Sequence, residues 1–219
     1  HDITTIERAV MMMGISPFLH EFSDVPTIEN QIADHPKALI GVLKVISRAR
    51  RAARYARDWA ILRHDLDVDE ITVAALLSEV TEILCWTFAP TLTQDVYAMQ
   101  RAEHSLRSAA AQRMVFNFSA KELQLALVSH WHLPELLVSM MDEKYIHNAR
   151  VRTVQLANSL ARHTSQGWDD AAIPDDLSAI EELLHIGREN LLHRLSVPHE
   201  AAERLLTAGG RADGALPPM

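Results

Sequence analysis

Apolar positions along this sequence recur at spacings of three and four residues almost from end to end, which is the period of amphipathic α-helices. The longest such segment extends from Pro36 to about residue 63. Its buried face is predicted to comprise Leu39, Leu43, Ile46, Ala49, Ala53, Ala56 and Ala60. Pro36 suits a first helical turn, because proline has no amide hydrogen to leave unpaired there. The four alanines would let a second helix approach closely.

The segment from residue 67 to about residue 88 is apolar on most of its circumference, which predicts one helix in the centre of the fold. Asp67 and Glu70 have the spacing of a capping box at its start. Leu77 and Leu84 are expected to be buried in it, so that alanine at either position costs roughly 2–5 kcal/mol of stability.

Shorter helices are predicted along the rest of the chain, at residues 4–13, from Thr27, at 91–104, 107–116 and 119–131, from Pro134, and at 149–164, 176–186 and 198–208. Ser119 and Glu122 form a second capping-box pattern. The fold class is therefore all-α, a compact multi-helix bundle. Residues 1–208 are predicted to form a single domain, and residues 209–219 a disordered tail.

The composition of the 219 residues, with 48% hydrophobic and 23% charged side chains, is typical of a soluble globular protein. The single cysteine, Cys85, excludes internal disulfides and cysteine-based zinc sites. No apolar run approaches the roughly 18 residues that span a bilayer, and no signal peptide is predicted. We therefore expect a cytoplasmic protein without a membrane partner. The net charge of −8 disfavours a nucleic-acid partner, whose binding depends on neutralising phosphates.

Basic residues nevertheless gather on the long helix, where Lys44, Arg48, Arg50, Arg51, Arg54 and Arg57 follow one another closely. Arginine clusters can bind phosphate or carboxylate through paired hydrogen bonds. Such a row can equally be a solvated helix face paired with acidic neighbours. The sequence leaves both interpretations open.

The dipeptide His64-Asp65 suggests a different chemistry, that of a metal-dependent phosphohydrolase. Such enzymes need an adjacent histidine and aspartate, with further ligands from other helices, to hold a divalent ion that activates water. His64 and Asp65 fall in the polar connection after the long helix, where ligands would be poorly held. This position favours a loop histidine and a helix-flanking aspartate.

Four segments together resemble a known family. They are Ile6–Gly14 (IERAVMMMG), Ala75–Leu84 (ALLSEVTEIL), Leu127–Leu136 (LVSHWHLPEL) and Val151–Ala161 (VRTVQLANSLA). Their order and spacing are similar to those of HDOD domains, the HD-related output domains of bacterial signalling proteins, over about residues 4–165. The resemblance implies the helical fold of the HD superfamily. Members of that family have an additional N-terminal helical lobe, which this sequence, beginning at His1, does not include. A fragment, a cleaved product and a lineage with a divergent beginning would each account for this, and the sequence does not decide among them.

The departures from this pattern concern the metal ligands. Ser78-Glu79 follows the Leu-Leu pair where the HD relatives commonly carry His-Asp, and Arg48 lies near the position of their first histidine. Asp142-Glu143 replaces a His-His pair. A guanidinium has no lone pair for a metal. The resemblance thus implies an HD fold without its catalytic centre, with no metal and no other cofactor, in which Arg48 and Glu79 form an ion pair.

The candidate ligand-binding residues of this altered pocket are Arg48, Arg51, Ser78, Glu79 and Asp142. They would line either a structural ion pair or a site for a nucleotide-like ligand. The resemblance implies a non-catalytic signal-transduction module that binds a protein partner or a small regulatory ligand. The alternative is a divergent metal-dependent HD phosphohydrolase that uses His64 and Asp65. The sequence specifies no oligomeric state.

Overall fold

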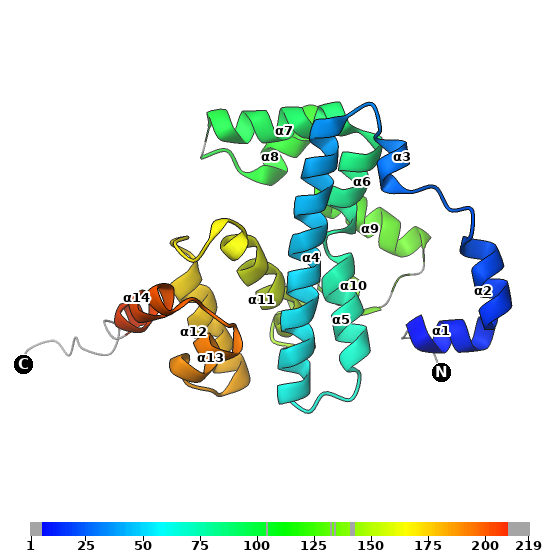
Figure 1. The fold of residues 1–219 in the computed structure, drawn as a ribbon. Helices are drawn as coiled ribbons and strands as arrows, with labels where there is room; N and C mark the ends of the chain where they lie inside the picture. The colour runs from blue at the N-terminus through cyan, green and yellow to red at the C-terminus, as the bar shows by residue number, and fades with distance from the viewer. Residues whose placement is uncertain (1–5, 104, 132, 134, 141–142, 210–219) are drawn as a thin grey trace, which may run out of the picture.

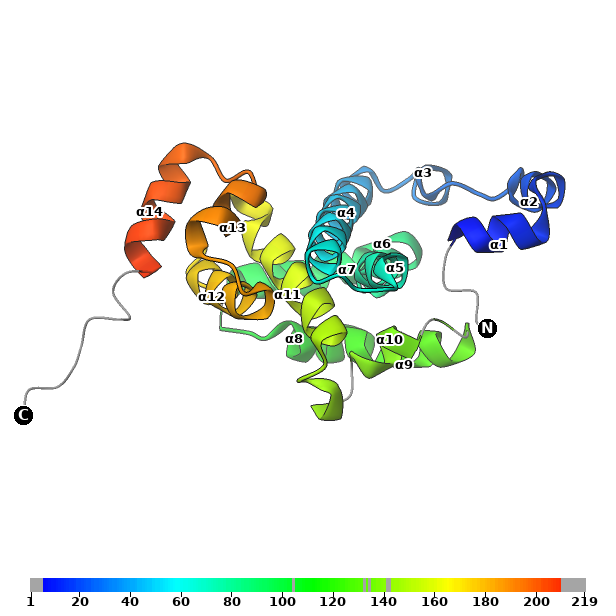
Figure 2. The same cartoon turned by 90° about the horizontal axis from the view of Figure 1, so that it is seen from below.

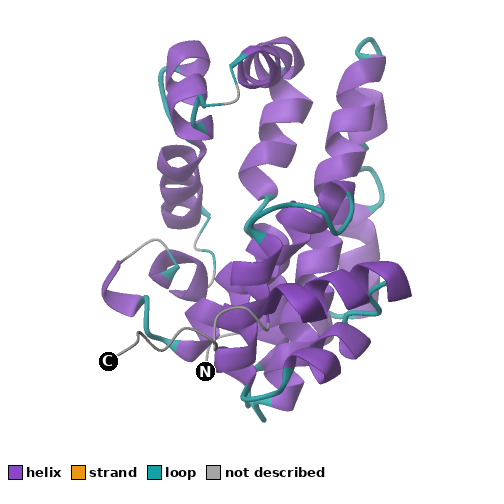
Figure 3. Ribbon diagram, turned by 90° about the vertical axis from the view of Figure 1, so that its left-hand side faces the viewer, coloured by secondary structure: helices purple, strands orange, loops and turns teal. Residues whose placement is uncertain are grey.

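The computed structural model describes residues 6–103, 105–131, 133, 135–140 and 143–209, and these residues form helices without any strand (Figures 1 and 3). This confirms the all-α fold class. The α-helices and the two 3₁₀ helices, η1 and η2, are α1 Ile6–Met13, α2 Ile15–Phe22, α3 Ile28–Gln31, α4 Pro36–Leu62, α5 Val68–Leu77, α6 Val80–Phe88, α7 Pro90–Ala102, α8 Ser108–Phe116, α9 Ala120–His130, α10 Glu135–Ser139, η1 Glu143–Tyr145, α11 Ala149–His163, η2 Thr164–Gln166, α12 Ile173–Leu184, α13 Arg188–Arg194 and α14 His199–Gly209.

Helix α4 is the axis around which the other helices are arranged (Figure 1). The chain turns after α4 and returns alongside it as α5, and α7 crosses near the beginning of α4. Figure 2 shows α5 and α6 on one side of α4 and α11 to α14 on the other. The buried alanines Ala49, Ala52, Ala53, Ala56 and Ala60 explain how α5 and α11 both pack closely against α4.

The buried face of the first half of α4 differs from the predicted one. Leu43 is 52% exposed, whereas Val42 and Val45 are buried. They pack with Trp86 of α6 in a small apolar cluster. Gly41 permits this packing, because a Cβ atom there would lie 2.6 Å from Cε2 of the Trp86 ring. The main core lies further along, where the second half of α4 meets α5 and α11 to α14.

The predicted single helix over residues 67–88 is wrong, since the structure has two helices that meet at Ser78 and Glu79. Glu79 has φ −98° and ψ 2°, outside the helical values. Asp67 makes no side-chain cap. Leu77 and Leu84, which lie on either side of the break, are half-buried instead of fully buried. Their substitution by alanine is therefore expected to cost less than a core leucine would.

The segment Val68–Phe88 also corrects the expectation that no apolar stretch approaches the length needed to span a bilayer. Within the described residues it alone is long and apolar enough, by length and composition, to cross a membrane, with a mean hydropathy of 1.5. It comprises α5 and α6, which are divided at Ser78–Glu79 and pack against α4. Core helices of soluble proteins can be equally long and apolar.

Helix ends match the predictions in part. Ser119 and Glu122 form the predicted capping box at the start of α9, and Thr27 caps α3. Helix α12 begins three residues earlier than predicted, at Ile173, and α2 was not predicted. Gly209 belongs to α14, so the predicted tail would begin one residue later, and residues 210–219 lie outside the described residues. The single domain over residues 1–208 remains a prediction.

Leucine-to-alanine substitutions test the assignment of buried faces. Leu160 of α11 is fully buried in the main core, so Leu160→Ala is expected to lower the free energy of unfolding by roughly 2–5 kcal/mol. Leu43→Ala makes the same chemical change at a half-exposed position and should cost less than about 1 kcal/mol. Urea denaturation of both variants measures the difference. Equal losses would show that the face of α4 is assigned wrongly.

The α9 capping box gives a pH prediction. The pKa of Glu122 is lowered to about 2, first by the backbone N–H of Ser119 and then by the guanidinium of Arg113. Because the folded pKa is below the unfolded value, the stabilisation is complete above about pH 4.5 and is lost as the pH falls toward 2. Titration of the Glu122 carboxyl carbon by NMR should give a midpoint near the lowered value. A midpoint near 4.5 would contradict the cap.

Candidate functional site

A cluster of one arginine and two glutamates joins the middle of α4 to the beginning of α6. Arg48 Nε donates to Glu79 Oε1 at 3.1 Å, and its Nη2 donates to Glu79 Oε2 at 2.6 Å. The same Nη2 lies 2.7 Å from Oε2 of Glu82. The Arg48 and Glu79 side chains are only 15% and 16% exposed. The predicted Arg48–Glu79 ion pair is therefore present, in bidentate geometry.

Glu82 is a member of this cluster that the sequence interpretation missed. It lies three residues after Glu79, and residues at that spacing share one side of a helix, which is the signal that could have identified it. Its other carboxylate oxygen accepts a hydrogen bond from the hydroxyl of Tyr97 in α7. The cluster thus links α4, α6 and α7.

The electrostatics of the cluster keep both donors protonated. Burial alone would lower the pKa of Arg48, but the hydrogen bond to Glu79 and the charge of Glu82 outweigh it and raise that pKa. Burial, followed by the charge of Glu82, raises the pKa of Tyr97. Arg48 therefore remains a cation and Tyr97 a hydrogen-bond donor at neutral pH.

The other predicted site residues are distributed differently. Arg51 Nη1 donates to the Thr164 carbonyl oxygen at 2.9 Å, so its guanidinium is held at η2 and not at the glutamates. Ser78 Oγ donates to the Ala74 carbonyl oxygen at 2.8 Å within its own helix. Asp142 lies outside the described residues. The structure therefore brings Arg48 and Glu79 into direct contact and leaves Arg51 and Ser78 with other partners.

Arg48 and Arg51 nevertheless share a cleft of about 690 Å³ between α4, α7 and η2. Its lining residues come from α4, α7 and η2, together with Trp86 of α6. Its further cationic residues are Lys37 and Lys44 of α4 and Arg101 of α7. Among the predicted site residues that the structure describes, Arg48 and Arg51 line this cleft, whereas Ser78 and Glu79 do not.

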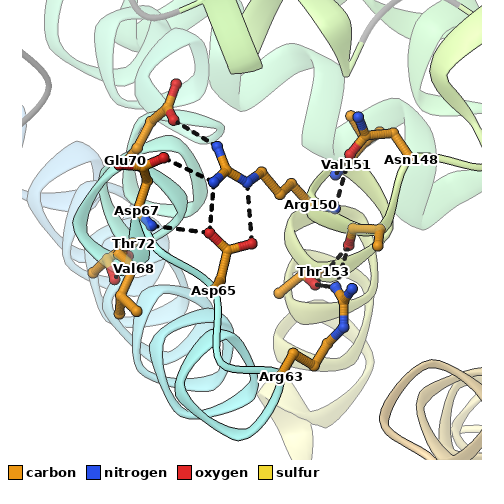
Figure 4. A network of polar contacts seen from close by, with 11 residues as sticks. Arg63, Asp65, Asp67, Val68, Glu70, Thr72, Asn148, Arg150, Val151 and Thr153 are labelled. Atoms are coloured by element: carbon orange, nitrogen blue, oxygen red, sulfur yellow. Dashed lines mark hydrogen bonds and ion pairs between the residues drawn. The ribbon is translucent and has the colours of Figure 1, made fainter.

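The second candidate site, at His64 and Asp65, has a structural role for its carboxylate. Asp65 binds Arg150 of α11 through both oxygens, at 2.7 and 3.0 Å (Figure 4). Asp67 and Glu70 contact the same guanidinium at 2.8 and 3.3 Å. His64 is exposed in a left-handed conformation, with φ 53°. Within the part of the chain that the structure describes, no three His, Cys, Asp or Glu side chains are grouped so that they could hold a metal ion.

The fold and this site define an all-α protein in which an arginine–glutamate cluster ties the central helices together. Comparison with protein-family models gives a match to the HDOD domain over residues 1–147. The chain belongs to the HDOD domain family, a family of signalling and regulatory domains. The match ends before Val151–Ala161, so that part of the predicted resemblance is not covered by it. No curated protein and no solved structure matches the chain.

Neutralising Glu79 tests the cluster. Glu79→Gln removes the anion that Arg48 binds through two hydrogen bonds, and we expect the free energy of unfolding to fall by about 1–3 kcal/mol. Glu200→Gln makes the same change at an exposed position of α14 and should alter stability by less than about 0.5 kcal/mol. Urea melts compare the two variants. A Glu79→Gln protein as stable as the Glu200→Gln control would show that the pair contributes nothing.

Proposed function

We propose that this chain is a non-catalytic signalling module that acts by binding a protein partner or a small regulatory ligand. The observation that carries the proposal is the bidentate Arg48–Glu79 pair. By the family resemblance, Glu79 stands where HD phosphohydrolases commonly carry an aspartate ligand, and Arg48 lies near the position of their first histidine. The family assignment supports a signalling or regulatory role in general terms.

The chemistry of the pair opposes metal binding at this point. The guanidinium of Arg48 offers donors only and remains charged at every physiological pH. Both carboxylate oxygens of Glu79 accept from Arg48, and Glu82 accepts from Arg48 and Tyr97. A divalent cation would have to displace these hydrogen bonds and lie beside a buried positive charge. Such a site would be electrostatically unfavourable.

The alternative function, metal-dependent phosphohydrolysis at His64 and Asp65, has less support. Asp65 is already bound through both oxygens by Arg150. A metal there would have to compete with a guanidinium that three carboxylates hold in place. The contact with Arg150 of α11 gives the Asp65 carboxylate a structural role that needs no ligand.

Metal analysis and turnover assays distinguish the two functions. We expect the purified protein, incubated with Mn²⁺ and desalted, to retain less than stoichiometric metal. It should hydrolyse neither a chromogenic phosphodiester nor nucleotides above the rate of a His64→Asn control. Asparagine suits this control because it tolerates the left-handed conformation at residue 64. Stoichiometric Mn²⁺ together with turnover that His64→Asn abolishes would overturn the proposal in favour of the phosphohydrolase.

A further inference from the structure

One face of α4 presents a line of cations to the cleft. The cleft-lining residues Lys37, Gly41, Lys44, Arg48 and Arg51 follow at spacings of four, three, four and three. This spacing keeps them on a single side of the helix. From Lys37 to Arg51 the helix rises by about 21 Å, at 1.5 Å per residue. A small, extended ligand with several charged groups could therefore contact more than one of these residues at once.

Two further elements complete the cleft. Helix α7 contributes Arg101, which adds a cation across from α4, and η2 contributes Ser165 and Gln166. Trp86 and Tyr97 supply aromatic surface to the lining. These two rings lie 5.3 Å apart between their centroids. The cleft thus combines cations from two helices with the half-buried ring of Tyr97, whereas Trp86 is only 6% exposed.

The charges of the cleft are mostly not neutralised by the protein itself. None of its lining residues is a carboxylate. Arg48 is paired with Glu79 and Glu82, neither of which lines the cleft. Among the described residues Lys37, Lys44 and Arg101 have no carboxylate within ion-pair distance, and Arg51 is held by the neutral Thr164. This concentration of positive charge occurs in a chain of net charge −8.

We propose that this cleft binds a small phosphorylated anion of the nucleotide class that carries at least two phosphate groups. The inference rests on the proposed non-catalytic function and names its ligand. Lysine and arginine are the side chains that bind phosphate oxygens, and the volume of about 690 Å³ lies within the usual range for small-molecule sites. The aromatic lining suits a base. The acidic remainder of the chain disfavours a nucleic-acid polymer, which needs many phosphates neutralised at once.

Isothermal titration calorimetry tests the proposal with pyrophosphate, ADP, ATP and a cyclic dinucleotide as probes. We expect at least one nucleotide to bind saturably, and more tightly than pyrophosphate does. The variant Lys44→Ala/Arg101→Ala removes two cations from opposite sides of the cleft and should weaken that binding by about tenfold or more. The control Arg50→Ala/Arg54→Ala makes the same change in net charge on exposed positions of α4 outside the cleft. It should change the affinity by less than about twofold.

Three results would overturn the proposal. One is that no probe binds saturably at concentrations up to about 1 mM. Any dissociation constant would then be above about 1 mM, and the binding free energy weaker than about −4.1 kcal/mol. Another is an equal loss of affinity in the two double variants, which would indicate only a general charge effect. A third is pyrophosphate binding as tightly as the nucleotides. None of these results involves turnover, so a cleft that binds no nucleotide would leave the proposed non-catalytic function standing. Metal-dependent hydrolysis would refute that function whatever the measured affinities are.

Discussion

The largely buried guanidinium of Arg48 is the constraint on which the centre of this structure depends. A cation that has lost most of its contact with water needs anions beside it, because an uncompensated buried charge is strongly destabilising. Glu79 and Glu82 meet this need from the first residues of α6. The break between α5 and α6 lies at Glu79 itself. The same cluster reaches α7 through Tyr97, so three helices are positioned around one charge.

The parts of this arrangement that local sequence determines could be predicted. The 3.6-residue period and Pro36 identified α4, and the Ser119–Glu122 spacing identified the start of α9. The Arg48–Glu79 pair followed from the family resemblance. The exposure of Leu43 could not be predicted, because periodicity defines an apolar stripe on a helix but not which neighbouring helix covers it. On the first half of α4 the covering residue is Trp86, which packs closely against Gly41. The break at Ser78–Glu79 was not predicted either, since the apolar residues of α5 and α6 continue the helical period on both sides of it and neither glycine nor proline marks it.

The basic residues of α4 required the structure for their separate roles. In sequence they form one cluster, which a structural ion pair and a ligand site explain equally well. In three dimensions Arg48 is neutralised by glutamates, whereas Lys44 and Arg101 face a cleft without carboxylates. The ion-pair interpretation therefore applies to Arg48, whereas the ligand site is our proposal for the cleft that Lys44 lines. Asp65, the acidic residue of the candidate metal pair His64-Asp65, likewise has a structural partner, because it binds the guanidinium of Arg150 (Figure 4).

The Arg48–Glu79 ion pair holds α4 to the beginning of α6, and a double-mutant cycle measures its contribution to stability most directly. Arg48→Met, Glu79→Gln and the double variant are compared with the original protein by urea denaturation, and the coupling free energy is obtained from the four stabilities. The account predicts a favourable coupling of at least about 1 kcal/mol, since the two side chains share two hydrogen bonds in a half-buried position. A coupling near zero would contradict it.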